Sequence, residues 1–379
     1  MAARTSVLII SDILAHAPRP ARHGTFSGET SGSQTRLNCP FRRNLQYTSL
    51  WELEGATLRA ILAVLLLGFV SIVPATVAQT TAQSNPCEER TLVVSVTDKV
   101  GPVMNLNKSN FHLESKLPIE VASATTHHPS PRALFVLDLS GSMRSPGKLK
   151  VIASLARGII DASAPNALFA FVTFSDNVRD RLEFPAPKEI LLQKLEAISR
   201  EPPDANGGRT ALFDTLIQAV GMFGKPQPGD AIFLISDGAD NRSQARGHDV
   251  KKLLLERGVR LFSFVPFDVV FPAEEVKLGP APLADLSYEA GGRSFSLERR
   301  SSVSRWDDSE QALTREYEMG KYMYVLAASS YYLEIVVKRV IEKPAALKLK
   351  IVDSNGEAMH DVKFLYPQEL MSCPGSDHR

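Results

Sequence analysis

The feature that most constrains the fold is an alternation of apolar runs and helix-period segments between residues 132 and 296. Continuous apolar runs such as Ala133–Leu137 and Ala231–Ile235 are typical of strands that are covered on both faces of a sheet. Between such runs, segments such as Lys148–Ile160 place their apolar residues on one helical face. Strands that alternate with helices pair in parallel through right-handed crossovers. The sequence therefore predicts an α/β domain with a doubly wound, mostly parallel, Rossmann-like sheet.

Shorter strands are expected on both sides of this domain, where turn residues separate short runs of strand-forming residues. They are Thr91–Val96 and Ile119–Ala124 before it, and Tyr322–Ala327, Tyr331–Val337, Leu347–Val352 and Val362–Tyr366 after it. Asn355-Gly356 is a hairpin signal between the last two, because both residues tolerate positive φ. Since the tail is too short for a large core of its own, we expect both groups of strands to form one small β-sandwich that flanks the α/β domain.

An uncharged segment near the N-terminus predicts export of the rest of the chain. Residues 60–73 form an apolar run of 14 residues behind Arg59, and the small residues Thr76 and Ala78 fit signal-peptide cleavage before Gln79. The uncharged stretch from 60 to 78 is 19 residues long, so a single anchor in the inner membrane is the alternative. Basic residues before the run keep the N-terminus in the cytoplasm, and the remainder becomes periplasmic, secreted or displayed at the cell surface.

Five regions follow from these features. They are a disordered or over-annotated leader at 1–56, a signal peptide or membrane anchor at 57–78, an N-terminal β segment and linker at 79–130, the α/β domain at 131–300, and a linker with a C-terminal β segment at 301–379. Export places Cys87 and Cys373 in an oxidising compartment, where a disulfide between them is chemically permitted. Two unpaired thiols are the alternative, because the sequence does not show that the two residues meet.

The charge balance disfavours a nucleic-acid partner. The chain has 43 Lys and Arg residues and 42 Asp and Glu residues, a formal net charge of +1, whereas phosphate neutralisation needs a basic surplus or patch. Residues 1–78 carry 7 basic and 4 acidic residues, so the exported part carries 36 and 38 and is mildly acidic. The net charge of the exported part therefore gives no long-range electrostatic attraction to an acidic partner.

Three loops carry oxygen side chains at predicted strand ends or helix starts. The segment Asp138-Leu139-Ser140-Gly141-Ser142-Met143 follows the first apolar strand, Thr210 lies in a loop that opens a helix, and Asp237 follows Ala231–Ile235. Ligands of open α/β sheets bind outside the carboxyl ends of the strands. Carboxylates and hydroxyls are hard donors that suit Mg²⁺, Mn²⁺ or Ca²⁺. Each residue alone fits a turn or a helix cap, but all three loops in order favour a metal site.

The first loop resembles the Asp-x-Ser-x-Ser signature of the von Willebrand factor type A (VWFA) domain, which carries a metal-ion-dependent adhesion site (MIDAS). The resemblance covers residue 132 to about residue 296. It implies hydroxyl ligation by Ser140, Ser142 and Thr210. It also implies that Asp138 holds the metal through water and that Asp237 is the acidic residue of the third loop. A carboxylate from an Asp or Glu of a protein partner would then take the open coordination position.

Two further acidic residues are assigned supporting roles. Asp214 and Asp240 are expected to orient the metal ligands or to cap helices. The flanking sequences TLVVSVTDKVGPVMNLNKSNFHL and FLYPQELMSCP resemble those of exported VWFA-related proteins of acidobacteria.

Three functions from different classes remain open at this point. The main hypothesis is a non-enzymatic, exported module for metal-dependent protein binding of the adhesion type, with unknown oligomeric state. The alternative is a membrane-anchored assembly or chaperone component that acts beside a separate ATPase, because the chain has no phosphate-binding loop of its own. A metal-dependent phosphatase or hydrolase with Asp138 as nucleophile is less favoured. Dehalogenase-like phosphatases need a second carboxylate two residues on, where this chain has Ser140.

We predict that the exported protein begins at Gln79, because the apolar run is short for a membrane span and small residues precede this position. Mass spectrometry of the N-terminal peptide of the mature protein measures this directly. A mature chain that retains residues 60–78 would contradict cleavage and favour the anchored alternative.

Overall fold

A computed structural model of the chain describes residues 89–126, 131–202, 208–268, 280–299 and 305–373. The expected leader and the signal peptide or anchor at 57–78 lie outside the described residues, and so does Cys87. Cys373 is disulfide-bonded, and its pairing with Cys87 stays a prediction. Across the described ranges, no helix has both the length and the apolar character that a membrane crossing requires.

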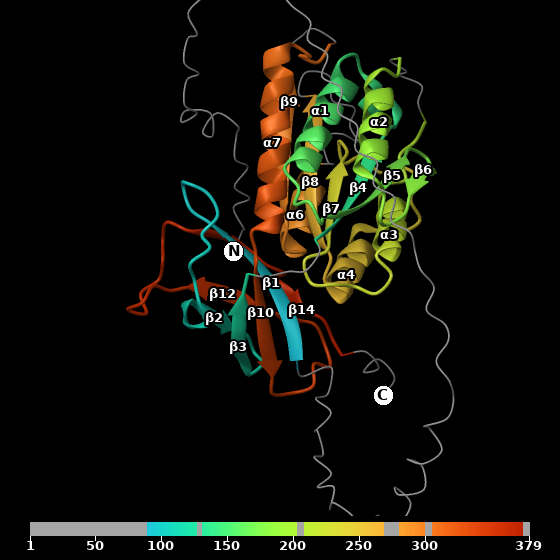
Figure 1. The fold of residues 1–379 in the computed structure, drawn as a ribbon. Helices are drawn as coiled ribbons and strands as arrows, with labels where there is room; N and C mark the ends of the chain where they lie inside the picture. Colours follow the sequence, from blue (N-terminus) through green and yellow to red (C-terminus); the bar gives the residue numbers. More distant parts are fainter. Residues whose placement is uncertain (1–88, 127–130, 203–207, 269–279, 300–304, 374–379) are drawn as a thin grey trace, which may run out of the picture. The chain divides into compact units, whose positions relative to one another are not determined.

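The larger part of the structure is built on a six-stranded sheet (Figure 1). Its strands, in spatial order, are β6 (Val178–Leu182), β5 (Leu168–Phe174), β4 (Arg132–Asp138), β7 (Ala231–Ile235), β8 (Arg260–Asp268) and β9 (Arg293–Arg299). All neighbours pair in parallel except β6, which pairs antiparallel with β5 at one edge. The doubly wound, mostly parallel sheet is therefore confirmed.

Helices cover both faces of this sheet (Figure 1). One face packs against α1 (Lys148–Asp161), α2 (Lys188–Ser199) and α7 (Glu310–Ala328), and the other packs against α3 (Leu212–Met222), α4 (Gly247–Arg257) and α6 (Pro280–Glu289). Successive residues of β4 alternate between the two cores, with Phe135 in the first and Leu134 and Val136 in the second. Because both faces are buried, the central strands are apolar at nearly every position.

Helices α1 and α7 are held close together by two glycines. A methyl group on Gly158 of α1 would overlap the carbonyl oxygen of Tyr317, and one on Gly320 of α7 would overlap the carbonyl oxygen of Leu155. Each glycine thus lies against the backbone of the opposite helix. This close approach fixes the position of α7 on the sheet.

The strands on either side of the α/β domain form one smaller β unit. It contains three small sheets. The first has four strands, in the order β13 (Lys363–Leu365), β1 (Glu89–Thr97), β10 (Tyr331–Val337) and β3 (Ile119–Thr125). The other two are pairs: β12 (Lys348–Ile351) with β2 (Phe111–Glu114), and β11 (Ala345–Ala346) with β14 (Glu369–Leu370). Residues from both ends of the described chain, such as Val94 and Leu333, share one core. The expectation that the two flanks combine is confirmed.

A buried arginine joins the two parts. The guanidinium of Arg260 in β8 donates hydrogen bonds to the carbonyl oxygens of Gly291 (2.9 Å) and Ala327 (3.1 Å) and to the hydroxyls of Ser330 (2.9 Å) and Ser95 (2.7 Å). Burial lowers the pKa of Arg260 to about 10, so it stays charged at neutral pH. Its four acceptors come from the α/β domain, the end of α7 and the β unit, and they offset the cost of burying the charge.

One predicted strand is wrong. Residues 322–327 belong to α7, which continues to Ala328. The aromatic and β-branched residues Tyr322, Tyr324 and Val325 favour a strand locally, but Met323, Leu326 and Ala327 pack into the core of the α/β domain from a helix. Tertiary packing therefore overrides local propensity. Since α7 packs on α1, the α/β layers extend past the boundary expected at residue 300.

The Asn355-Gly356 signal marks a local turn, but the strands on either side of it do not pair with each other. Gly356 has a φ of +82°, and the Asp353 carboxylate accepts hydrogen bonds from the N–H groups of Asn355 (2.8 Å) and Glu357 (2.9 Å). Strand β12 pairs instead with β2, and β13 with β1. Across the turn, Val352 and Ala358 form an antiparallel bridge, and the N–H of Met359 donates to the carbonyl of Ile351 at 2.9 Å. The hairpin turn is therefore confirmed, but it is short, because β12 and β13 each have a more distant partner in the shared core.

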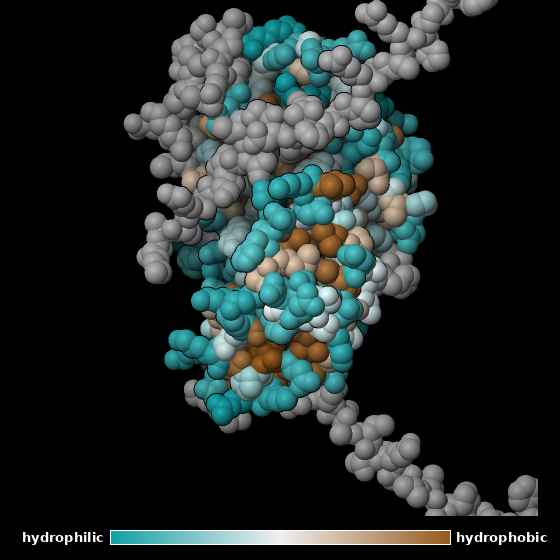
Figure 2. Space-filling view, turned by 90° about the vertical axis from the view of Figure 1, so that its left-hand side faces the viewer, coloured by the Kyte–Doolittle hydropathy of each residue, from teal (hydrophilic) through white to brown (hydrophobic). Residues whose placement is uncertain are grey.

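Figure 2 shows one face of the molecule. Where this face is coloured, hydrophobic side chains form separate patches among hydrophilic ones rather than one broad apolar area. Within the described residues, the exposed large hydrophobic side chains are also scattered along the chain. They are Val100, Met104, Ile190, Tyr288, Val325 and Val340. Scattered apolar residues of this kind are normal for a soluble surface.

We predict that Gly158→Ala and Gly320→Ala each lower the free energy of unfolding by about 1–3 kcal/mol, because the added methyl group forces α1 and α7 apart. Urea unfolding of the full chain, followed by circular dichroism, measures this. Gly221→Ala is the matched control: it also lies in a helix, but nothing lies within 4 Å of its added methyl group. There we expect a gain of about 0.5–1 kcal/mol. Equal effects at all three glycines would refute the close-packing argument.

Candidate functional site

The predicted metal residues gather where the strand order of the large sheet reverses. Strand β4 lies between β5 and β7, so the chain passes to one side of β4 and then to the other. Asp138 is the last residue of β4, and Asp237 follows the end of β7 by two residues. Because β4 and β7 are parallel neighbours, both carboxylates lie at the same edge. This is the crevice in which open α/β sheets bind ligands.

Asp138 connects the first loop to the third. Its carboxylate is fully buried; Oδ1 accepts a hydrogen bond from the N–H of Ser140 at 2.8 Å, and Oδ2 accepts one from the hydroxyl of Ser236 at 2.6 Å. Burial, with a further contribution from the charge of Asp237, raises the pKa of Asp138 to about 7, while the bonds from Ser236 and Ser140 oppose the rise. Each oxygen of Asp138 therefore accepts a hydrogen bond, one from the first loop and one from the third, and the carboxylate connects the two loops.

The two serines of the first loop lie together. Their hydroxyl oxygens, on Ser140 and Ser142, are 3.3 Å apart. Leu139 and Met143 on the same loop are buried in the core of the α/β domain, and the short 3-10 helix Gly141–Arg144 begins between the serines. The apolar residues thus anchor the loop from below, and the spacing of the motif brings two oxygen donors to one place.

Asp237 presents a carboxylate oxygen with no hydrogen bond. Its Oδ1 accepts a long hydrogen bond of 3.3 Å from the N–H of Ala239, whereas the buried Oδ2 has no hydrogen-bond partner. The ammonium of Lys148 forms an ion pair with Oδ2 at 3.6 Å. An anionic oxygen that is buried without a hydrogen bond is costly. The arrangement is therefore typical of a position at which a cation is held.

Lys148 was not among the predicted site residues. It is the first residue of α1 and is 3% exposed; its Nζ donates to the carbonyl oxygen of Ser142 at 3.1 Å and lies 5.2 Å from the centre of the Trp306 ring. A lysine at the start of an amphipathic helix gives no sequence signal of burial. Only the path of the chain from the first loop into α1 brings its ammonium to the carboxylates.

The second loop joins the site through its backbone. Thr210 is buried; its N–H donates to Oδ1 of Asn241 at 2.9 Å, and its carbonyl accepts from the N–H groups of Asn241 and Arg242 at 3.1 Å each. The N–H of Ala211 donates to the carbonyl of Ser175 at 2.6 Å. Thr210 is thus fixed beside the loop that follows β7. Within the described ranges, no hydrogen bond connects its hydroxyl to Ser140 or Ser142.

Asp214 and Asp240 cap and cross-link the second and third loops. Oδ2 of Asp240 accepts a hydrogen bond from the N–H of Phe213 at 2.8 Å, at the start of α3. In return, the Asp214 carboxylate accepts from the N–H groups of Gln244 (3.0 Å) and Ala245 (2.9 Å). Asp240 thus caps the start of α3, one of the two roles expected for it, whereas Asp214 connects α3 to the loop before α4.

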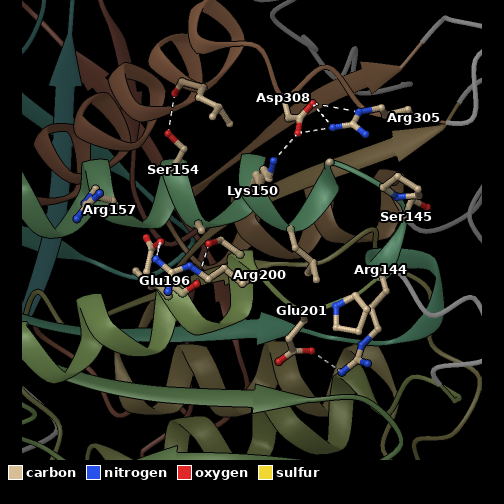
Figure 3. Close-up of a pocket in the computed structure, with 18 of the residues that line it drawn as sticks. Arg144, Ser145, Lys150, Ser154, Arg157, Glu196, Arg200, Glu201, Arg305 and Asp308 are labelled. Atoms are coloured by element: carbon tan, nitrogen blue, oxygen red, sulfur yellow. Dashed lines mark hydrogen bonds and ion pairs between the residues drawn. The ribbon is translucent and has the colours of Figure 1, made fainter.

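A cavity of about 700 Å³ lies beside the first loop, between α1, α2 and the start of α7 (Figure 3). Its charged lining residues are Arg144, Lys150, Arg157, Arg200, Arg305, Glu196, Glu201 and Asp308. Ion pairs connect Arg144 to Glu201 (2.8 Å), Arg200 to Glu196 (2.7 Å), and both Lys150 and Arg305 to Asp308 (2.8 Å each). Basic groups outnumber acidic ones in this lining. Sequence reasoning missed the cavity because its walls come from segments far apart in the chain.

The donor set fits a hard divalent cation. It contains two buried carboxylates and nearby hydroxyls, and the part of the chain that the structure describes has no group of three or more His, Cys, Asp or Glu residues that could hold a metal ion. Zinc sites are built from such groups, whereas Mg²⁺ and Mn²⁺ accept hydroxyl and water ligands. Oδ2 of Asp237, which accepts no hydrogen bond, is the negatively charged oxygen that such an ion would need as a ligand.

Comparison with known families identifies the larger domain. Residues 133–239 match the model of the von Willebrand factor type A domain. The matched segment contains all five predicted metal residues, Asp138, Ser140, Ser142, Thr210 and Asp237. The chain therefore contains a VWFA domain, as the sequence resemblance implied.

Several solved structures are similar to the chain. A von Willebrand factor type A protein from Catenulispora acidiphila is 14% identical, with a TM-score of 0.40 over 78% of this chain and 76% of that one. An aerotolerance-related membrane protein from Bacteroides fragilis, with multiple mutations to serines, is 16% identical, with a TM-score of 0.36 over 50% and 99%. BatB from Bacteroides thetaiotaomicron is 17% identical, with a TM-score of 0.36 over 50% and 98%. No curated protein matches. Similarity at this level says nothing about function.

We predict that Ser236→Ala lowers the free energy of unfolding by about 1.5–3 kcal/mol at pH 8 in EDTA, because it leaves Oδ2 of the buried Asp138 carboxylate without its hydrogen bond. Ser263→Ala is the matched control, since it removes an equally buried hydroxyl whose partner is the neutral hydroxyl of Ser287, 2.9 Å away. There we expect about 0.5–1.5 kcal/mol. Urea unfolding measures both. A Ser236 cost no larger than that of Ser263 would show that Asp138 does not depend on this bond.

Proposed function

We propose that this chain is an exported, metal-dependent protein-binding module that takes an Asp or Glu carboxylate of a partner at the loops after β4 and β7. The observation that carries the proposal is the buried Oδ2 of Asp237, which has no hydrogen bond. It lies at the switch point of a VWFA domain, whose first loop holds the paired hydroxyls of Ser140 and Ser142. The module performs no reaction: it binds.

The residues that would hold Mg²⁺, or Mn²⁺ or Ca²⁺ in its place, are the hydroxyls of Ser140, Ser142 and Thr210 together with Asp237. Asp138 has both oxygens committed to Ser140 and Ser236, which supports its expected role of acting through water. The cation would supply positive charge that neutral hydroxyl ligands leave uncompensated, and this favours an outside carboxylate.

The charges around the site support an acidic partner. The exported part is mildly acidic as a whole, so attraction has to be local. Arg144 follows the first loop directly, and its side chain borders the cavity in which basic groups outnumber acidic ones (Figure 3). A partner segment whose carboxylate reaches the site would therefore meet positive charge beside it. Nucleic acid is not part of the proposal, because the basic residues of this lining are mostly paired with acids.

We predict that peptides selected on the immobilised full chain in Mg²⁺ from a random displayed library, and eluted with EDTA, are enriched in Asp or Glu. Binding should be lost when the acidic residue of a selected peptide is replaced by its amide, because a neutral group no longer compensates the cation. Fluorescence anisotropy of the labelled peptides measures binding.

Ser142→Ala should abolish this binding, because it removes one of the paired hydroxyls. Ser163→Ala, at the far end of α1, should leave it unchanged, because its hydroxyl donates only to the carbonyl of Ile160. Peptide binding that persists in EDTA, or that tolerates loss of the acidic residue, would overturn the proposal.

A further inference from the structure

Lys148 is a charged residue in a place that disfavours a positive charge. It begins α1, where the helix dipole presents its positive end, and there is no acidic residue in the first turn of that helix. The residue is only 3% exposed, so its ammonium is also removed from water. A buried cation at a helix N-terminus is costly unless other groups compensate it.

The compensating groups among the described residues lie at the metal site or against it. The carbonyl oxygen of Ser142 accepts a hydrogen bond from Nζ at 3.1 Å, and the Asp237 carboxylate lies 3.6 Å away. The face of the Trp306 ring lies 5.2 Å from Nζ, as in a cation–π contact. Trp306 is itself held in place, because its backbone N–H donates a hydrogen bond to the carbonyl of Pro146 at 2.8 Å. These contacts hold the ammonium toward the carboxylates.

The carboxylates need a counter-charge when no metal is bound. Asp138 and Asp237 are both completely buried and repel each other. In the part of the chain that the structure describes, Lys148 is the residue whose ion pair reaches this pair of carboxylates. Arg144, the basic residue that follows the first loop, forms an ion pair with Glu201 at 2.8 Å and donates from Nε to the carbonyl of Leu139 at 3.2 Å.

We propose that Lys148 is an internal counter-ion that sets the affinity of the site for divalent cations. Its ammonium stabilises the fold in the metal-free state by neutralising Asp237, and it opposes cation binding because it places a like charge beside the same carboxylate. The inference rests on the metal site of the proposed function and deepens it. It makes Lys148 a determinant of how much free Mg²⁺ the module needs.

Lys148→Met in the full chain tests this, because methionine keeps an unbranched stem against Trp306 and removes only the charge. Titration with Mn²⁺ and with Mg²⁺ by isothermal calorimetry should show affinities at least about tenfold tighter than in the wild type, since Coulomb repulsion between two close cations is lost. In EDTA, the unfolding equilibrium constant should rise by about 100-fold or more, because a buried carboxylate loses its partner.

Lys188→Met is the matched control. Lys188 also begins a helix and also lies over an aromatic ring, that of Phe169 at 5.6 Å, but none of its described contacts is with a carboxylate of the site. Its cation affinity should stay within about twofold of the wild type. If Lys148→Met unfolds in EDTA, Mg²⁺ should restore the circular dichroism of the folded protein.

The outcomes separate the two proposals. If the wild type binds Mn²⁺ and Lys148→Met binds it equally or more weakly, the counter-ion inference is wrong and the binding function stands. The same holds if Lys148→Met unfolds in EDTA and Mg²⁺ fails to refold it, although Mg²⁺ binds to the wild type and to Lys188→Met. If neither the wild type nor any variant binds a divalent cation, the metal site itself is wrong, and the proposed function fails with it.

Discussion

The structure of the site depends on one buried carboxylate that is shared between two loops. Asp138 ends the central strand β4, and its two oxygens accept hydrogen bonds from the first loop at Ser140 and from the third loop at Ser236. Parallel neighbouring strands bring those loops to the same edge, and these two bonds tie them to each other. Burial raises the pKa of Asp138, and the two hydrogen bonds offset part of the cost of burying its charge.

The supporting framework reaches the site from the opposite end of the sheet through α7. Gly158 and Gly320 hold α7 against α1 at van der Waals distance, and the buried guanidinium of Arg260 binds the carbonyl of Ala327 at the end of α7. The start of α7 is preceded by Trp306, which lies over Lys148 beside the metal site. One helix thus connects the β unit, the core and the site. The flanking β unit is part of the support of the site rather than an independent appendage.

Most of the sheet was predictable because its signals are local. A continuous apolar run such as Ala231–Ile235 predicts a buried strand from its own residues, and Asp138 is marked by the strand before it. The errors concern features that distant contacts decide. Residues 322–327 form helix because Met323, Leu326 and Ala327 pack into the core of the α/β domain. Strands β12 and β13 pair with β2 and β1 rather than with each other. Lys148 escaped prediction for the same reason, since its burial depends on Trp306, 158 residues later in the chain.

Under the proposed function, the charges of the site explain why its occupant would be acidic although residues 79–379 are already mildly acidic. Two carboxylates and the ammonium of Lys148 leave the group with one negative charge when both acids are ionised. A divalent cation would reverse that to one positive charge, in a place where burial makes any net charge costly. One additional carboxylate would then bring the net charge of the site to zero. Beyond Asp138 and Asp237, the described part of the site offers no further carboxylate. Without Lys148 the cation alone would neutralise the pair. The same lysine that weakens cation binding thus creates the demand for an outside carboxylate, so cation and partner should bind together rather than separately.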